Sequence, residues 1–192
     1  VDGFRVVAKS RAIIGVFGIT ILFNLVFPPH SPLIPVFAQK IQEVGPTAMG
    51  VLGSASGLGA LIGTLYIISK RRIGSRSRYY YGGTLLCIAS LFVFGVSGYY
   101  PLSLLGLFVA GAGMAGFGTM QATLILTSVA EGMRGRLMGI QSMAIGVIPI
   151  GSLVMGVLAE LWGPRHAVAS VAAVGFVMTV AWVAVAKELR RL

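Results

Sequence analysis

Long stretches without a charged side chain dominate the pattern of polar and hydrophobic positions. Five stretches lack Asp, Glu, Lys and Arg, and each is long enough for a membrane-spanning helix, which needs about 20 apolar residues. They cover residues 12–39, 44–69, 79–130, 137–159 and 167–186. The third stretch is too long for one helix, and the turn-forming segment 97–101 (Ser-Gly-Tyr-Tyr-Pro) divides it. The pattern therefore predicts six helices, at about 12–28, 46–69, 79–97, 101–129, 137–161 and 164–186, after a cytoplasmic linker at 1–11.

Basic residues are distributed very unevenly over the loops between these helices. If the chain crosses the membrane at each helix, thirteen of the fifteen Lys and Arg residues fall on one side, and only Lys40 and Arg165 on the other. Missing or adding one helix would exchange the sides of every later loop and destroy this division. Because cytoplasmic loops of membrane proteins carry an excess of Lys and Arg, we expect both termini in the cytoplasm.

The composition favours a membrane protein and excludes several other classes. Hydrophobic residues make up 56% of the chain, charged residues make up 10%, and the mean hydropathy is +0.91, too apolar for a water-soluble domain. The net charge of +10 does not indicate a nucleic-acid partner, because the basic residues form short clusters beside apolar stretches, where lipid headgroups lie. The single cysteine, Cys87, lies in an apolar stretch and cannot form a disulfide within the chain.

No pattern in the sequence indicates an enzyme. The segment 111–116 matches G-x-G-x-x-G, but it lies inside an apolar run without a preceding strand, so helix packing explains it better than nucleotide binding. An intramembrane serine protease would need a His base beside its nucleophile. His30 and His166 are both expected near the outer ends of helices, far in depth from Ser56. We therefore expect no catalytic residue, no cofactor and no metal site.

The first apolar stretch admits two interpretations. A basic flank, an apolar run and the small-residue end Val36-Phe37-Ala38 also describe a signal peptide with its cleavage site. However, the run is long for a signal. The prolines at positions 28, 29, 32 and 35 are equally typical of a broken helix end beside a cavity. His30 lies among these prolines, where a role at the outer membrane interface is favoured over proton relay.

Small residues and a few uncharged polar residues are expected inside the bundle. Helices in lipid associate through small residues that let their backbones approach closely. We expect six glycines of the second and fourth helices to pack in this way: Gly53, Gly57, Gly59, Gly63, Gly111 and Gly113. Four polar side chains are candidates for contact with a solute, although a hydrogen bond to a neighbouring helix explains each equally well: Asn24, Ser56, Gln121 and Gln141. No carboxylate lies at membrane depth, so a proton-coupling acid would have to lie elsewhere.

The loop before the fifth predicted helix carries the most informative motif. Residues 133–139 read Met-Arg-Gly-Arg-Leu-Met-Gly. This segment resembles the M-R-G-R-h-M-G signature that opens the eleventh helix of major facilitator superfamily transporters, especially the bacterial exporters that include the enterobactin and macrolide efflux proteins. Segments 2–5, 71–76 and 149–165 agree with the same branch. The chain is therefore similar to helices seven to twelve, the C-terminal half of a twelve-helix fold with 3+3 inverted repeats, and a first residue of valine fits such a fragment.

The resemblance implies a secondary active transporter of the bacterial inner membrane. Such a protein would export a small molecule, for example a drug, a macrolide or a siderophore-like compound, by alternating access. The solute would bind between this half and an N-terminal six-helix half, and membrane lipids would surround both. The first, second, fourth and fifth helices would face the cavity or the other half, and the third and sixth would lie outside. Two alternatives are a half-size carrier that acts as a homodimer and a membrane scaffold that transports nothing.

The same resemblance assigns residues to the cytoplasmic loops and gates. They are Arg72, Gly74, Arg76, Glu131, Arg134, Gly135 and Arg136. The family often has an Asp before the basic cluster that follows this half's second helix. No acid stands at that place here, so the resemblance gives no support to the gating contact attributed to it. Glu131 precedes a helix whose positive end favours an anion, and a role as a helix cap explains it as well as a gating role.

Overall fold

Helices make up all the regular secondary structure that the computed structural model describes, in residues 10–70, 75–127 and 131–186. The main helices are α2 (Arg11–Val26), α4 (Pro46–Ser69), α5 (Arg76–Val96), α6 (Tyr100–Thr127), α7 (Arg134–Ile145), α8 (Ile148–Trp162) and α9 (Pro164–Val185). Shorter turns are η1 (Pro28–Leu33), α3 (Ile34–Val36), η2 (Phe37–Ile41) and η3 (Glu131–Met133). In these described ranges, six helical segments are long and apolar enough to cross a membrane. The predicted all-α fold with six membrane-spanning helices is confirmed.

The first span continues past its prolines, where the sequence analysis ended it at about residue 28. After α2, the chain forms the 3₁₀-helix η1, the short α3 and the π-helical η2, so that the helical path extends to Ile41. A proline has no N–H for the carbonyl four residues earlier, and the backbone therefore changes its hydrogen-bonding pattern. Phe37 and Ala38 are fully buried in this segment. This burial favours a spanning helix over a signal peptide cleaved at that point.

The fifth span is broken, although the sequence predicted one helix over 137–161. α7 ends at Ile145 and α8 begins at Ile148. Pro149 cannot donate a hydrogen bond to the carbonyl of Ile145, which removes one bond of a continuous helix and breaks it there. Beyond the break, Gly151 lies against the backbone of Leu25, so closely that a Cβ atom at this position would overlap it. The other helix ends differ from the predicted ones by three residues or fewer. For example, α5 was predicted to begin at residue 79 and begins at Arg76.

Four of the six predicted packing glycines lie in close contacts with neighbouring helices. A Cβ atom at Gly111 would overlap the carbonyl oxygen of Ser56 in α4, and one at Gly59 would overlap the carbonyl oxygen of Phe108 in α6. Gly63 similarly meets Ala112, and a Cβ atom at Gly113 would lie 2.6 Å from the carbonyl oxygen of Gly83 in α5. These contacts let α4 and α5 pack directly on α6.

The other two glycines, Gly53 and Gly57, lie on the exposed side of α4, and a Cβ atom added to either would have no neighbouring atom within 4 Å. At about 100° per residue, this pair points about 120° away from the pair formed by Gly59 and Gly63. One neighbouring helix cannot meet both pairs. α6 contacts the second pair, and the first pair remains open in this chain.

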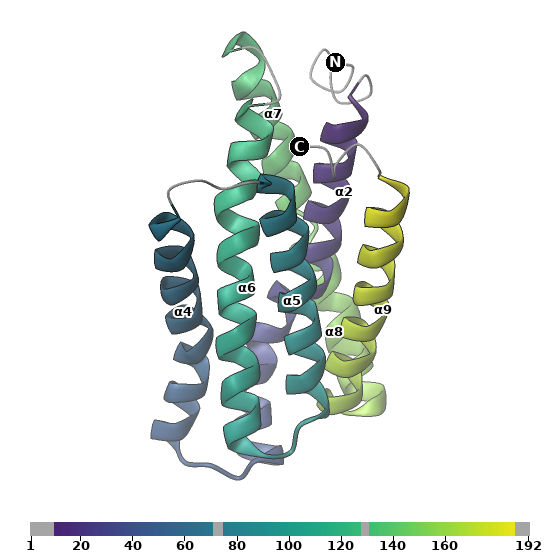
Figure 1. Cartoon of the computed structure of the whole chain (residues 1–192). Coiled ribbons are helices and arrows are strands. Elements are labelled where there is room, and N and C mark those ends of the chain that lie inside the picture. The colour runs from purple at the N-terminus through teal and green to yellow at the C-terminus, as the bar shows by residue number, and fades with distance from the viewer. Residues whose placement is uncertain (1–9, 71–74, 128–130, 187–192) are drawn as a thin grey trace.

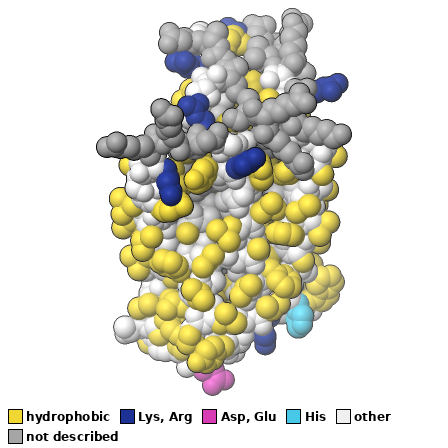
Figure 2. All heavy atoms as spheres, in the orientation of Figure 1, with side chains coloured by type: hydrophobic (Ala, Val, Ile, Leu, Met, Phe, Trp, Pro, Cys, Tyr) yellow, Lys and Arg dark blue, Asp and Glu magenta, His cyan; other side chains and the backbone are white. Residues whose placement is uncertain are grey.

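The helices form one bundle in which α4, α6, α5 and α9 lie side by side in that order (Figure 1). The described chain begins and ends at the same end of the bundle, where α2 starts and α9 finishes (Figure 1). Lys and Arg side chains gather at that end, and hydrophobic side chains cover the middle of the visible face (Figure 2). This surface suits a membrane-embedded bundle with one strongly basic end.

Candidate functional site

A buried cluster of hydroxyl and amide groups joins three helices. Thr20 of α2, Tyr80 of α5 and Gln121 of α6 meet there, and each is at most 5% exposed. The hydroxyl groups of Thr20 and Tyr80 are 2.9 Å apart, and the Gln121 side-chain amide donates to the Thr20 hydroxyl oxygen at 2.8 Å. The Tyr80 hydroxyl also donates to the Val16 carbonyl oxygen at 2.9 Å. These bonds satisfy polar groups that would otherwise be buried without partners in an apolar interior.

The sequence analysis gave no role to Thr20 or Tyr80. Tyr80 stands in a run of three tyrosines just after Arg76 and Arg78, a pattern typical of the membrane interface. The structure instead buries Tyr80 completely. The one available signal was the spacing of Thr20 and Asn24, which are four residues apart and therefore share a face of α2.

Asn24 and Gln121 are the two predicted solute contacts that the structure brings together, because both bond to Thr20. The Asn24 amide donates to the Thr20 backbone carbonyl at 2.8 Å, within the same helix. Both residues are nearly buried. Their side-chain oxygens accept no hydrogen bond from a described residue, and neither oxygen is sealed from the surface. These two oxygens can therefore accept hydrogen bonds from a solute.

Ser56 and Gln141 lie apart from this cluster. Ser56 is half-buried at the crossing of α4 and α6, where its backbone carbonyl faces Gly111. Gln141 is half-buried in α7, and its side-chain oxygen is enclosed without a hydrogen-bond partner among the described residues. The four predicted polar residues therefore do not form one site within this chain.

A column of stacked aromatic rings extends from the cluster along the inside of the bundle. Phe117 lies between Tyr80 and Phe23, with ring centroids 5.3 Å and 3.8 Å away, and Phe23 in turn stacks on Phe27. All four rings are buried. They are packing elements of this bundle.

His30 ends this column and is buried, where the sequence favoured a position at the outer interface. Its ring lies 4.6 Å from that of Phe27, centroid to centroid, and its Nδ1 contacts the Phe27 carbonyl oxygen. Its Nε2 is enclosed without a hydrogen-bond partner among the described residues. The proline-rich 3₁₀ segment turns His30 inward, toward Phe94, instead of toward lipid headgroups.

The predicted gate residues that the structure describes lie at the basic end of the bundle. Arg72 and Gly74 are outside the described residues. Arg76, Gly135 and Arg136 are exposed, Arg134 is half-buried, and Arg136 Nη1 lies 3.9 Å from the sulfur of Met133. Met133 is the residue that caps α7, so Glu131 stands two positions before the cap, at the start of η3.

The chemistry available in this interior is that of neutral hydrogen-bonding groups among aromatic and aliphatic side chains. Among the described residues, no group of His, Cys, Asp and Glu side chains could hold a metal ion. Amide oxygens among apolar side chains are suited to binding an uncharged or amphipathic solute, and they are not suited to acid–base chemistry.

Comparisons with known proteins identify the family. The Major Facilitator Superfamily model matches residues 3–191. The staphyloferrin A transporter of Staphylococcus aureus is 27% identical over 167 residues, which cover 85% of this chain. The chain spans 40% of the length of that transporter. This family consists of membrane transporters, not enzymes. With six helices suited to a bilayer and a family match over nearly its whole length, the chain is a multi-pass membrane protein that belongs to the Major Facilitator Superfamily.

Proposed function

We propose that this chain is the C-terminal six-helix half of a secondary active transporter that exports a small molecule. The observation that carries this proposal is the family match over residues 3–191, combined with a fold of six membrane spans. The Arg134-Gly135-Arg136 segment opens the fifth span, as the eleventh-helix signature of the family does. We further propose that the protein lies in a bacterial inner membrane with both termini in the cytoplasm, because the basic end of the bundle carries the start of α2 and the end of α9.

A second six-helix half would cover surfaces that this chain leaves open. α4 is mostly exposed, and large apolar side chains such as Leu58 and Leu61 stand on it beside the open Gly57. α8 similarly exposes Leu153 at 70%. In a transporter of this family, rocking of one half against the other at such surfaces would open the solute site alternately to the two sides.

The substrate we favour among drugs, macrolides and siderophore-like compounds is the last class. The relative from Staphylococcus aureus is by its name a siderophore transporter. Asn24 and Gln121 would offer side-chain oxygens to hydrogen-bond donors of the solute. The described spans contain no carboxylate at mid-depth, because Glu43 and Glu160 stand near helix ends. We therefore place the proton-coupling acid in the other half.

Transport by the complete gene product tests this proposal. The codons upstream of Val1 are sequenced first, and the whole product is expressed. Inverted membrane vesicles, in which an exporter takes up solute, are then given labelled siderophores and macrolides with a proton gradient. We expect uptake of a siderophore that stops when the gradient is dissipated. Lack of uptake of every solute by a well-folded product would favour a scaffold. Uptake by this chain alone, with a dimeric mass, would favour the half-size carrier.

A matched pair of variants tests the solute contacts. Asn24→Leu keeps the side-chain size and removes both polar atoms, and it gives up a hydrogen bond only to its own helix. Thr179→Val is the control, because Thr179 is buried in α9 and also bonds only to its own helix, at the Gly175 carbonyl. We expect about a tenfold rise in the KM of the solute for Asn24→Leu, the size of one lost hydrogen bond to a buried partner. An equal change in Thr179→Val would contradict the assignment.

A further inference from the structure

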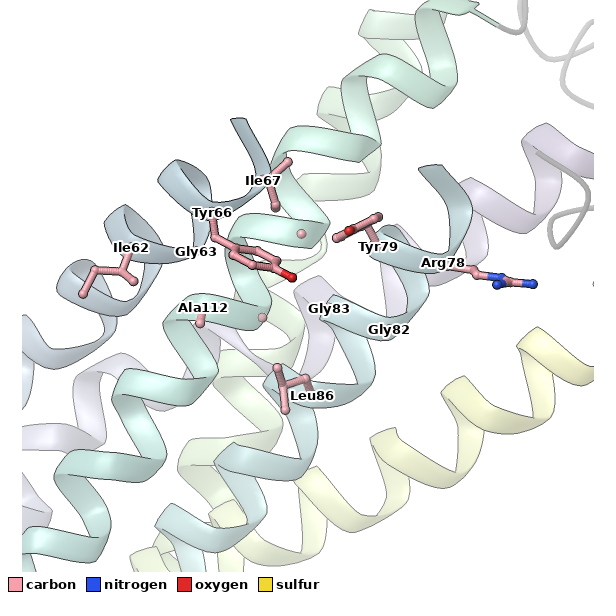
Figure 3. Close-up of a pocket in the computed structure, with 12 residues that line it drawn as sticks. Ile62, Gly63, Tyr66, Ile67, Arg78, Tyr79, Gly82, Gly83, Leu86 and Ala112 are labelled. Carbon is pink, nitrogen blue, oxygen red and sulfur yellow. The ribbon is translucent and has the colours of Figure 1, made fainter. Parts of the chain in front are cut away.

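A groove on the side of the bundle has no role in the function proposed above. It lies between α4 and α5 with α6 as its floor, near the basic end, and its volume is about 420 Å³ (Figure 3). This volume falls in the range of about 300–1,000 Å³ that is typical of ligand-binding cavities. The side chains of Ile62, Tyr66 and Leu86 stand along its opening and are about half exposed.

Glycines give the groove its depth. Gly83 of α5 packs against Gly113 and Gly116 of α6, where a Cβ atom would overlap the opposite backbone. Gly82, the next residue, also lines the groove but has no neighbour within 4 Å of its Cβ position. The floor is therefore backbone without side chains, and Gly82 is the one of these glycines whose side-chain position opens into free space.

The walls and the mouth of the groove differ in chemistry. Its lining is almost wholly apolar, and the rings of Tyr66 and Tyr79 stand near its basic end (Figure 3). Within the described ranges, neither tyrosine hydroxyl forms a hydrogen bond to another residue. Arg78 lines the rim and points away from the floor (Figure 3), and Lys70 Nζ lies 4.8 Å from the centre of the Tyr66 ring. Lys70 and two phenol groups thus stand at the mouth of an apolar slot, and Arg78 lies on its rim with its guanidinium directed away from the slot (Figure 3).

We propose that this groove holds one acyl chain of an anionic phospholipid, whose phosphate group binds at Arg78 and Lys70. An acyl chain fits an apolar slot that opens sideways from the bundle, and tyrosines are typical of the headgroup level. Basic pockets between membrane helices bind anionic headgroups. Among the glutamates whose side chains the structure describes, Glu43 and Glu160 both lie at the opposite end of the bundle. The proposal depends on the membrane location of the chain and not on its transport activity.

Native mass spectrometry of the purified gene product tests lipid binding directly. The protein is stripped of lipid in mild detergent and equilibrated with dioleoylphosphatidylglycerol or with dioleoylphosphatidylcholine. We expect one phosphatidylglycerol molecule to be retained, at least about fivefold more tightly than phosphatidylcholine, because each Lys or Arg near an anionic headgroup contributes about fivefold in affinity. Equal retention of the two lipids would overturn the role of the cations.

Two pairs of variants test the contribution of the apolar slot and that of the cations at its mouth separately. Gly82→Leu fills the slot without touching the helix contacts, and Gly156→Leu makes the same change at an open glycine of α8, outside the groove. Arg78→Gln removes a cation from the mouth, and Lys40→Gln removes one from the opposite end. We expect Gly82→Leu to lose the bound lipid and Arg78→Gln to lower the preference for phosphatidylglycerol about fivefold, with wild-type behaviour in both controls.

The outcome for transport distinguishes a lipid from a solute in the groove. If Gly82→Leu abolishes binding of the transported solute and still retains phosphatidylglycerol, the groove is a solute site and the proposal is overturned. Unchanged lipid retention in Gly82→Leu, with thermal stability equal to that of wild type, also overturns it. Failure of the protein to transport any tested solute leaves the lipid result intact, so that the two proposals fail separately.

Discussion

The hydroxyl group of Tyr80 connects the first and third membrane spans at the level of single residues. It bonds to the Val16 carbonyl of α2 and lies beside the Thr20 hydroxyl, which also accepts from Gln121 of α6. Thr20 and Tyr80 are fully buried, so a hydroxyl group that loses its partner there incurs a desolvation cost. However, measured hydrogen bonds between membrane helices are modest, since the unfolded chain in a membrane also finds partners.

Tyr80→Phe is therefore expected to lower the free energy of unfolding by about 0.5–1.5 kcal/mol. The change removes only the hydroxyl group and keeps the ring between its neighbours. Unfolding in mixed detergent and dodecyl sulfate micelles measures the loss. Tyr99→Phe is the matched control, because Tyr99 is 69% exposed and its hydroxyl bonds to no described residue. Equal losses in the two variants would show that the Tyr80 cluster does not stabilise the fold.

Polar residues inside the bundle could be predicted from the sequence, but their contacts could not. Asn24 and Gln121 stood out as polar groups in apolar helices, but the direction of each side chain depends on Thr20, whose partners are 60 and 101 residues away. His30 was expected at the outer interface because of its distance along the first helix, and only the packing of Phe27 and Phe94 shows that its side chain is enclosed. Contacts between distant residues leave no mark in local sequence.

Close backbone contact at Gly111 governs the packing of whole helices, and an added methyl group tests it. In Gly111→Ala, the new Cβ atom would overlap the Ser56 carbonyl, so α4 and α6 must separate. Overpacking of this kind costs about 1–3 kcal/mol, and a lower melting temperature in detergent would report it. Gly118→Ala is the control in the same helix, with no neighbour within 4 Å. It is expected to be neutral or slightly stabilising, because alanine favours the helix. Matching losses at both positions would contradict the contact.

Helices could be predicted from the sequence wherever the length of an apolar stretch is enough to define a membrane span. Five apolar stretches, one of them divided by a turn, gave six spans, and helix ends marked by Gly or Pro, as at Pro46 and Pro164, agree with the structure. The changes of helix type in the first span and the break in the fifth span were less predictable. A proline excludes one α-helical hydrogen bond, but it does not determine whether the chain stops, as expected near Pro28, or continues as a 3₁₀-helix. The packing of Phe37 on Phe94 and of Gly151 on Leu25 decides that in the folded chain.

The whole molecule is electrically asymmetric, and this asymmetry determines how it should insert. Arg11, Lys70, Arg76 and Arg134 stand at the ends of four different helices, and all of them belong to the same end of the bundle. Lys40 and Arg165 belong to the other end. Because basic loops are retained in the cytoplasm, the bundle has one favoured orientation, which reporter fusions at Lys40, Arg76, Tyr100, Arg134 and Arg165 should report as outside, inside, outside, inside and outside.

Cysteine labelling in intact cells tests this orientation with little background, because the natural Cys87 is fully buried. Lys40 and Arg76 are both exposed, at opposite ends. A membrane-impermeant maleimide should therefore label Lys40→Cys in intact cells and Arg76→Cys only after the membrane is permeabilised. The reverse pattern would show that the basic end faces outward. Labelling of both variants in intact cells would mean that α4, the one span between them, does not cross the membrane, against the expectation from its length and hydropathy.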